Sequence, residues 1–331
     1  MKEDKMTREE KYKNVGSNNE VVKIDEIKLE VEKKVEKKVG KKAEKKVEKK
    51  SIAKEQAVTI KTKKRKLKKK YFNILIIISL IMILYGIYNL INLSKDSKEI
   101  TKVSKKIEEV VIEKEIEDTD TTVIVKSAEK EKSIFWKYIK TPLINVNIHD
   151  LKNVNNDTKG WIKVGGTNIN VPFTQKYDNS YYLNHDYEKK INEFGWVFAD
   201  YRNKIDLTDK NLIIYGHNTA DTSMFGTLRH VITNKWLNNK QNHIINMSLE
   251  NTNTLWQVIS VYKVNNTTDY IQTDFDDESY KKFLDLITKR SIYNFGTTVG
   301  TSDKIITLST CSNNDTRIVL HAKLIKYDNK N

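Results

Sequence analysis

The feature that most constrains this chain is an uncharged apolar run at residues 71–93, YFNILIIISLIMILYGIYNLINL. A helix of that length is roughly 34 Å long, which is enough to cross a bilayer core of about 30 Å. A helix buried in a soluble core would carry a polar stripe, whereas aromatic residues such as Tyr71, Phe72 and Tyr88 gather near the ends of this run, as they do at membrane interfaces. The run therefore predicts an uncleaved transmembrane anchor at 71–93.

The charges that precede the run predict its orientation. Residues 61–70, KTKKRKLKKK, hold eight basic side chains in ten positions. Flanks of this kind stay on the cytoplasmic side of a membrane. We therefore expect residues 1–70 to be a basic cytoplasmic tail. Everything after residue 93 is then extracellular, on a single-pass protein of the cell membrane.

The formal net charge of +15 does not indicate nucleic-acid binding. Residues 1–70 hold 26 Lys or Arg against 13 Asp or Glu, a net of +13, so the other 261 residues carry only +2. A nucleic-acid-binding domain usually has its basic patch on the fold. Part of the tail, residues 31–50, repeats the tetrad VEKK with small changes. It is either a solvated charged segment or a stretch that adheres to anionic lipid.

The composition changes near residue 133. Residues 94–133 are charged and contain no Gly or Pro, which indicates a spacer, whereas all five Trp and all six His lie in 134–331. Within 134–331, short apolar runs such as GWIKV, NLIIYG, KIITLST and RIVLHAKLI read as strands. Helical patterns occur near 148–154, 223–232 and 278–290. We expect one mainly β domain with helical insertions, a barrel or a sandwich.

The single cysteine, Cys311, is a candidate nucleophile. It closes the apolar strand KIITLSTC and precedes a polar turn, SNNDT, after which the strand RIVLHAKLI begins. A lone Cys is often only a small buried apolar side chain. A strand end beside a loop, however, offers both rigidity and access. The hairpin would also return Arg317 to the side of Cys311.

His217 is the candidate base, because it follows the apolar strand NLIIYG just as Cys311 follows its own strand. His321 is its competitor. Four residues along a strand span roughly 13 Å, so Arg317 and His321 cannot both lie beside the cysteine. The remaining histidines stand in polar stretches and are expected at the surface: His149, His185, His230 and His243. No spacing of His, Cys or carboxylates suggests a zinc site.

Several motifs together resemble the sortase family. They are TLSTC (307–311), an Arg opening the next strand, and YGHN (215–218) after an apolar strand. DNSYYLNHD (178–186), GWVFAD (195–200) and the helical pattern at 278–290 resemble class B sortases in particular. The similarity covers about 148–327. The interval between Cys and Arg is shorter here than in many class B members.

The resemblance implies an eight-stranded sortase β-barrel with an N-terminal helical cap and an extracellular cysteine transpeptidase that needs no cofactor. Such an enzyme cleaves a sorting-signal peptide of exported proteins through a thioacyl intermediate and transfers it to an amine of the cell wall of a Gram-positive bacterium. Cys311 would be the nucleophile, His217 the acid and base, and Arg317 the cation for substrate and oxyanion. Four residues would line the peptide groove: Asn179, Leu183, Tyr215 and Ser309.

Two other functions remain open from the sequence. The same dyad could serve a hydrolytic cysteine protease, or the barrel could belong to a tethered binding protein without enzymatic activity. The sorting motif, the acceptor amine and the choice between wall anchoring and pilus assembly have no signal in the sequence.

Overall fold

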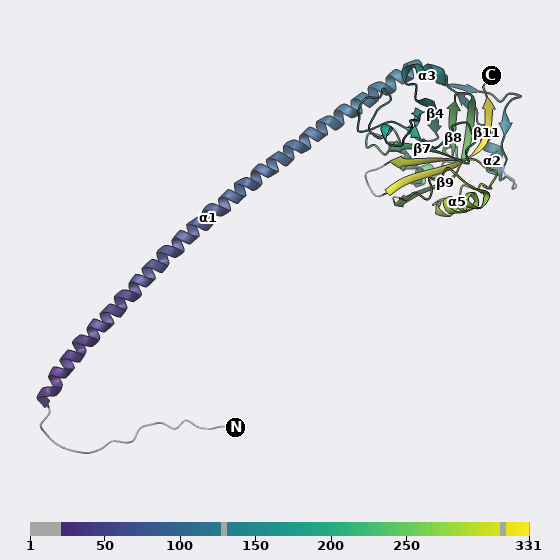
Figure 1. Ribbon diagram of the computed structural model, residues 1–331. Helices are drawn as coiled ribbons and strands as arrows, with labels where there is room; N and C mark the ends of the chain where they lie inside the picture. Colours follow the sequence, from purple (N-terminus) through teal and green to yellow (C-terminus); the bar gives the residue numbers. More distant parts are fainter. Residues whose placement is uncertain (1–20, 127–130, 266, 312–315, 331) are drawn as a thin grey trace, which may run out of the picture. The chain divides into compact units, whose positions relative to one another are not determined.

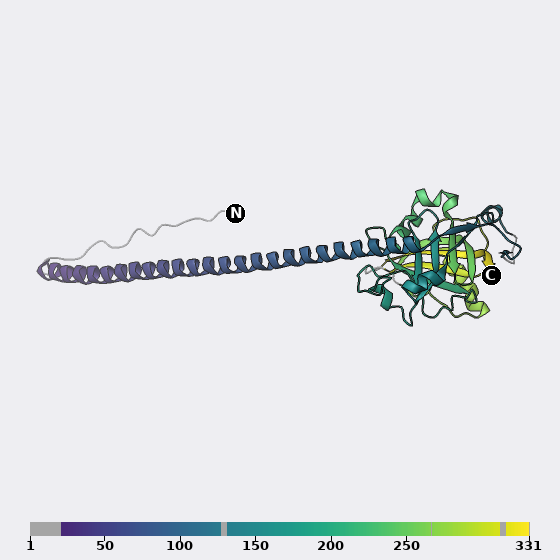
Figure 2. The same ribbon diagram turned by 90° about the horizontal axis from the view of Figure 1, so that it is seen from above.

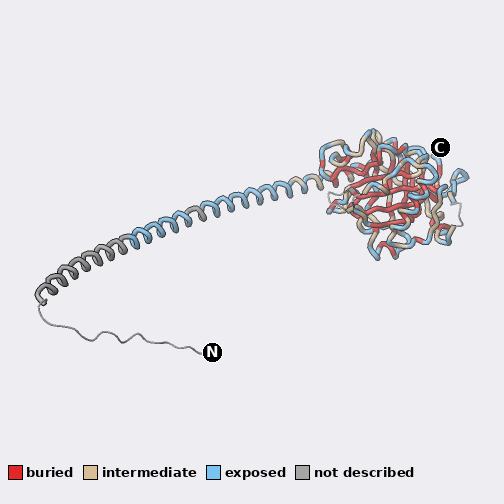
Figure 3. Tube along the Cα trace, turned by 60° about the horizontal axis from the view of Figure 1, so that its bottom comes forward, coloured by how far each residue is buried: buried red, intermediate tan, exposed pale blue. Residues whose placement is uncertain are grey.

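The computed structural model describes residues 21–126, 131–265, 267–311 and 316–330, with the backbone alone at 21–48, 65–68 and 311. The chain divides into two compact units, Met1–Gly86 and Ile87–Asn331. Within the described residues, one helical stretch, Lys49–Val110, is long and apolar enough to cross a membrane by length and composition. The apolar side chains at 71–93 are exposed (Figure 3), an arrangement that water disfavours.

All strands of the described residues lie in the second unit. Their bounds are β1 Lys114–Ile116, β2 Val123–Ile124, β3 Leu143–Asn145, β4 Thr158–Val164, β5 Asn170–Thr174, β6 Phe198–Ala199, β7 Asn211–His217, β8 Ile244–Leu249, β9 Thr252–Asn265, β10 Ile305–Cys311 and β11 Thr316–Asn329. The α-helices are α1 Val21–Val110, α2 Ser133–Tyr138, α3 Ile148–Val154, α4 Asn234–Leu237 and α5 Asp277–Arg290, and the 3₁₀ helices are η1 Tyr181–Leu183, η2 Gly226–Ile232 and η3 Lys240–Asn242.

The main sheet closes on itself as an eight-stranded barrel. Its order is β10-β7-β6-β5-β4-β8-β9-β11, and β10 also pairs with β11, so the first and last strands meet. The strands curve around a common interior in both views (Figures 1 and 2). β2 adds to β11 outside this ring. The expectation of an eight-stranded barrel is confirmed.

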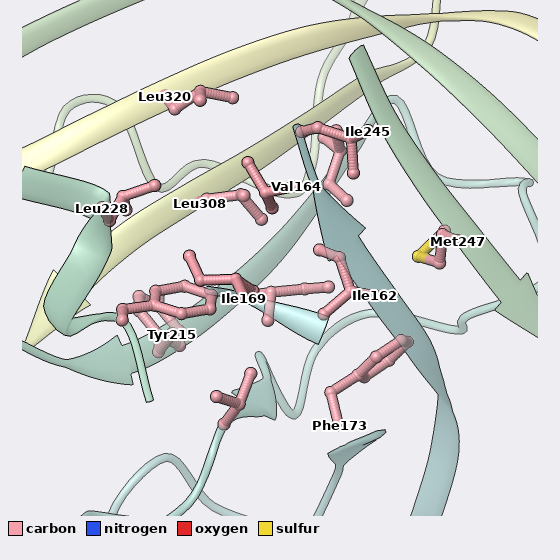
Figure 4. Close-up of a cluster of buried hydrophobic side chains, with 14 of the residues drawn as sticks. Ile162, Val164, Ile169, Phe173, Tyr215, Leu228, Ile245, Met247, Leu308 and Leu320 are labelled. Carbon is pink, nitrogen blue, oxygen red and sulfur yellow. The ribbon is translucent and has the colours of Figure 1, made fainter. Parts of the chain in front are cut away.

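Alternation along the strands separates the barrel interior from the outer layer. On β10, Ile306 and Leu308 belong to the main buried cluster, whereas Ile305 belongs to a second cluster with α5. Leu308 faces Leu320, Val164 and other apolar side chains in the interior (Figure 4). Buried residues accordingly concentrate in the strands (Figure 3).

Helices cover parts of the outer surface. α5 buries Tyr280, Phe283, Leu284 and Ile287, the apolar stripe that predicts it, against β9, β10 and β11. The helix predicted at 148–154 is α3, whereas the helical pattern at 223–232 corresponds to the 3₁₀ helix η2 at 226–232. A separate cluster includes Phe135 of α2. The Lys323 ammonium lies over the Phe135 ring and pairs with Glu131 at 2.9 Å, both side chains of this pair being almost fully buried.

Candidate active site

Two parallel strands end side by side at the predicted site. β7 and β10 pair in parallel, and their last residues, His217 and Cys311, are partners in the register. Neighbouring strands lie about 4.8 Å apart, so the two backbones are adjacent. Because parallel strands share their carboxyl edge, residues far apart in the sequence meet there. The structure thus brings the predicted base beside the predicted nucleophile.

Arg317 lies near the end of β10, on the neighbouring strand β11. The two strands are antiparallel, and their register reaches Ser309 opposite Val319. A continuation of this register would place Arg317 opposite Cys311. The guanidinium donates from Nη1 to the carbonyl oxygen of Thr310 at 3.3 Å, and the Ile318 amide donates to Thr310 Oγ1 at 3.0 Å. The loop predicted between the two strands, at 312–315, lies outside the described residues.

The imidazole of His217 is half-buried and has one nitrogen engaged. Nε2 lies 2.8 Å from the carbonyl oxygen of Leu183, which can only accept a hydrogen bond, so Nε2 carries a hydrogen. Any proton exchange by this ring would therefore take place at Nδ1. Gly216 supports this strand end, because a Cβ there would lie 2.6 Å from the ring of Phe225. The Phe225 amide also donates to the His217 carbonyl at 3.0 Å.

His321 is a structural histidine. Thr307 Oγ1 donates its hydrogen to Asn211 Oδ1, so His321 Nδ1 donates to Thr307 and Nε2 accepts from the Tyr262 hydroxyl, each at 2.8 Å. Complete burial, reinforced by the charge of Arg290, lowers the pKa of His321 to about 3. A ring that stays neutral and fully bonded is unsuited to acid–base exchange.

The expectation that His243 lies at the surface is wrong. Its exposed fraction is 2%, because it packs among the rings of Trp236, Tyr293 and Phe295. His149 and His230 are exposed and His185 is half-buried. Among the described side chains, no group of three or more His, Cys, Asp or Glu could hold a metal ion.

The carboxylate of Asp200 connects two of the predicted groove residues. Its Oδ2 accepts from Asn179 Nδ2 at 3.0 Å and from the Tyr215 hydroxyl at 2.9 Å. Asn179 Oδ1 in turn accepts from the Tyr201 amide at 3.0 Å. The functional groups of Asn179 and Tyr215 are therefore held in place by Asp200, whose own exposed fraction is 0%.

An ion pair ties this carboxylate to a third segment. Arg202 donates to both Asp200 oxygens, at 2.8 and 2.6 Å, and from Nη2 to the Ile271 carbonyl at 2.9 Å. Burial alone would raise the pKa of Asp200, but the hydrogen bonds from Arg202 and Tyr215 outweigh it and lower that pKa. The segment that contains Ile271 also reaches β10, because Tyr270 and Ser309 share a hydrogen bond of 2.9 Å between their hydroxyls.

Sequence reasoning missed Asp200 and Arg202. Asp200 is the last residue of the motif GWVFAD and Arg202 follows two residues later, and a D-x-R pair at the end of a short strand is a detectable signal. Its meaning depends on what the carboxylate reaches across the fold. Of the four predicted groove residues, Leu183 contacts His217 through its carbonyl, Asn179 and Tyr215 share the Asp200 carboxylate, and Ser309 pairs with Tyr215 between β10 and β7.

Comparison with known proteins agrees with this architecture. The family model described as the Sortase domain matches residues 162–325. The sortase B of Staphylococcus aureus is 36% identical over 188 residues, which cover 55% of this chain and 76% of the relative. The sortase B of Listeria monocytogenes is 34% identical over 203 residues, which cover 59% of this chain and 82% of the relative.

Solved structures match the same region. The Staphylococcus aureus sortase B–substrate complex has a TM-score of 0.51 and 37% identity, covering 54% of this chain and 84% of that chain. A sortase B complexed with triglycine has a TM-score of 0.51 and 36% identity, covering 54% of this chain and 85% of that chain. Both proteins therefore share the barrel and, at this level of identity, a common ancestry with this chain.

Proposed function

We infer that this chain joins exported proteins to an amine of the cell wall, because it belongs to the sortase family as a sortase B-like cysteine transpeptidase. It would cut a sorting-signal peptide, hold the acyl part on Cys311 and release it to the acceptor amine. The observation that carries the proposal is the register of β7 and β10, in which His217 and Cys311 are partners at the ends of two parallel strands.

The assignment of roles follows the chemistry of these groups. The Cys311 thiolate forms a bond to the peptide carbonyl carbon, and the bond from that carbon to nitrogen breaks as His217 Nδ1 gives its proton to the leaving amine. The incoming amine then attacks the thioester and returns a proton to Nδ1 as the carbon–sulfur bond breaks. Arg317 is a fixed cation for the oxyanion that forms in both steps.

The peptide groove would lie between the segments that Asp200 and Tyr270 connect. Asn179, Leu183, Tyr215 and Ser309 are its proposed lining. Asn179 and Tyr215 share the Asp200 carboxylate, which supports a rigid wall on the side of β7. Rigid walls reduce the entropy lost when a flexible peptide binds.

We further propose that the apolar run 71–93 anchors the enzyme in the cell membrane, with residues 1–70 in the cytoplasm, 94–133 as the connection and 134–331 as the extracellular catalytic domain. The basic flank at 61–70 supports this orientation. Partners would be the sorting-signal peptide of secreted proteins and an amine of a peptidoglycan precursor. The substrate and triglycine complexes of sortase B support partners of these two classes.

The test is a transfer assay on the full chain in detergent. The enzyme is incubated with a library of sorting peptides, with and without triglycine as the amine, and products are identified by mass spectrometry. We expect a cleaved peptide joined to triglycine and, when the amine is absent, an acyl adduct on the peptide that contains Cys311. Hydrolysis alone in the presence of triglycine would instead identify a protease.

A further inference from the structure

The helical segment Asp96–Ile107, which we call the strap, packs against the barrel although its sequence is highly charged. Ile100, Val103 and Ile107 have exposed fractions of 1%, 1% and 3% and belong to the main buried cluster of the barrel. Their spacing of three and four residues places them on one face of the helix, whose other face carries exposed lysines. The strap is the last part of α1 (Figures 1 and 2) and lies within the second unit.

The strap makes polar contacts with the loop that follows β5 and contains Leu183. Asp96 accepts from the Glu193 amide at its carboxylate and from Asn192 Nδ2 at its carbonyl, both at 3.1 Å. Further along, Lys106 pairs with Glu188. The loop therefore has contacts with both ends of the strap.

These contacts lie close to the carbonyl that orients His217. Gly195, two residues after Glu193, has φ +57°, and a Cβ there would lie 2.3 Å from the Tyr182 oxygen and 2.8 Å from the Leu183 oxygen. The backbone at 192–196 thus rests directly on the residue that accepts from His217 Nε2. A displacement of Asn192 and Glu193 would reach the Leu183 carbonyl through this contact.

The strap also holds the loop that leaves His217. Ser97 donates to Asp221 Oδ2 at 2.7 Å, while Asp221 Oδ1 accepts from the Ser223 amide at 3.0 Å. Thr222 and Met224 in this loop have φ of +70° and +48°, a left-handed backbone that such residues adopt only when their surroundings impose it. Met224 is buried in the same cluster as the apolar face of the strap.

We propose that the strap is a positioning element for the His217 imidazole. It holds both segments that determine where the ring lies, namely the carbonyl that fixes Nε2 and the loop that follows the strand. It touches no reacting atom, so it acts through these two loops. The apolar run ends at Leu93, so only Ser94 and Lys95 separate it from the strap. The anchor therefore precedes the positioning element almost directly in the chain.

The inference rests on the proposed role of His217. Its test distinguishes a failure of the strap proposal from a failure of the proposed function. In the full chain in detergent, Asp96→Ala combined with Ser97→Ala removes one polar contact to each loop and keeps the apolar face. The control is Lys98→Ala combined with Lys102→Ala, on the exposed face of the same helix. A third variant, Asp96→Asn with Ser97→Thr, restores an acceptor and a hydroxyl at the same positions.

We expect kcat for peptide transfer to fall about tenfold in the alanine pair, because small misplacements of a catalytic group are costly. KM should stay within about twofold, since Asp96 and Ser97 bond to Glu193 and Asp221, which are not among the proposed groove residues. The control should match the wild type, and the Asn/Thr pair should recover most of kcat. Thermal melting of each preparation monitors folding, and Ser97→Ala alone replaces the pair if the pair melts early.

Unchanged kcat in the alanine pair, an equal fall in the lysine control, or no recovery in the Asn/Thr pair would each overturn the proposal. His217→Ala is measured alongside. If His217→Ala is inactive while the alanine pair behaves like the wild type, the strap has no positioning role and the proposed function stands. If His217→Ala transfers peptide normally, the proposed function itself fails.

Discussion

Acidification should destabilise this protein through His321 by an amount that the structure allows us to work out. The ring is completely buried and its pKa is lowered to about 3 from an ordinary value of 6.5. Between these two values the unfolded chain binds a proton that the folded chain does not. The free energy of unfolding therefore falls as the pH falls below 6.5, by about 1.36 kcal/mol per pH unit.

At pH 5 this linkage amounts to about 2 kcal/mol relative to neutral pH. For a domain of this size, about 1 kcal/mol shifts the melting temperature by about 2–4 °C, so the expected loss is about 4–8 °C. Carboxylates whose pKa is lowered in the fold, such as Asp200 and Asp157, add their own loss at acid pH. The contribution of His321 must therefore be taken as a difference between variants.

The assay compares the wild type with His321→Gln, whose amide is neutral at every pH used. Melting temperatures of the full chain in detergent are measured by tryptophan fluorescence at pH 7.5 and 5.0. The wild type should lose about 4–8 °C more than His321→Gln between the two values. His149→Gln, at an exposed position, is the control and should follow the wild type. Parallel losses in the wild type and His321→Gln would refute the structural reading of this histidine.

Four further predictions concern the site and the anchor. Cys311→Ala should abolish both cleavage and transfer in the peptide assay, because an alkyl group cannot form the thioester; residual turnover would contradict the mechanism. Arg317→Lys should lose most transfer yet melt normally, since a point charge cannot replace a planar fork; near-normal transfer would make Arg317 structural only. Asp200→Asn should lower kcat/KM about tenfold or more. The control Glu131→Gln also removes a buried carboxylate, one that pairs with Lys323, and should lower stability without lowering kcat/KM. Equal losses of kcat/KM in the two variants would show that Asp200 does not hold the site in place. Protease added to intact protoplasts should digest the chain beyond residue 93 and spare an epitope within 1–60, and the reverse pattern would contradict the proposed orientation.

Local patterns in the sequence were sufficient to predict most of the elements and to single out Cys311 as the candidate nucleophile. Short apolar runs predicted the strands, because a barrel strand covered on its outer face by helices is apolar along most of its length. The helix stripe at 278–290 predicted α5, which begins one residue earlier. Cys311 and Arg317 flank a single short loop, so their proximity follows from hairpin geometry alone. Within the apolar segment GWVFAD, only Phe198–Ala199 form a strand.

Only the tertiary structure decided which distant groups meet. His217 joins Cys311 because β7 pairs with β10 in parallel and in a particular register, and no local periodicity contains that pairing. His321 is nearer to Cys311 in sequence, but burial keeps it neutral and out of reach. Asp200 and its partner Arg202 link segments from three parts of the chain, and the charged strap packs on the barrel through three apolar side chains. A sequence pattern reports which face of an element is apolar, whereas the partner of that face is set by long-range pairing and packing, which depend on the whole fold at once.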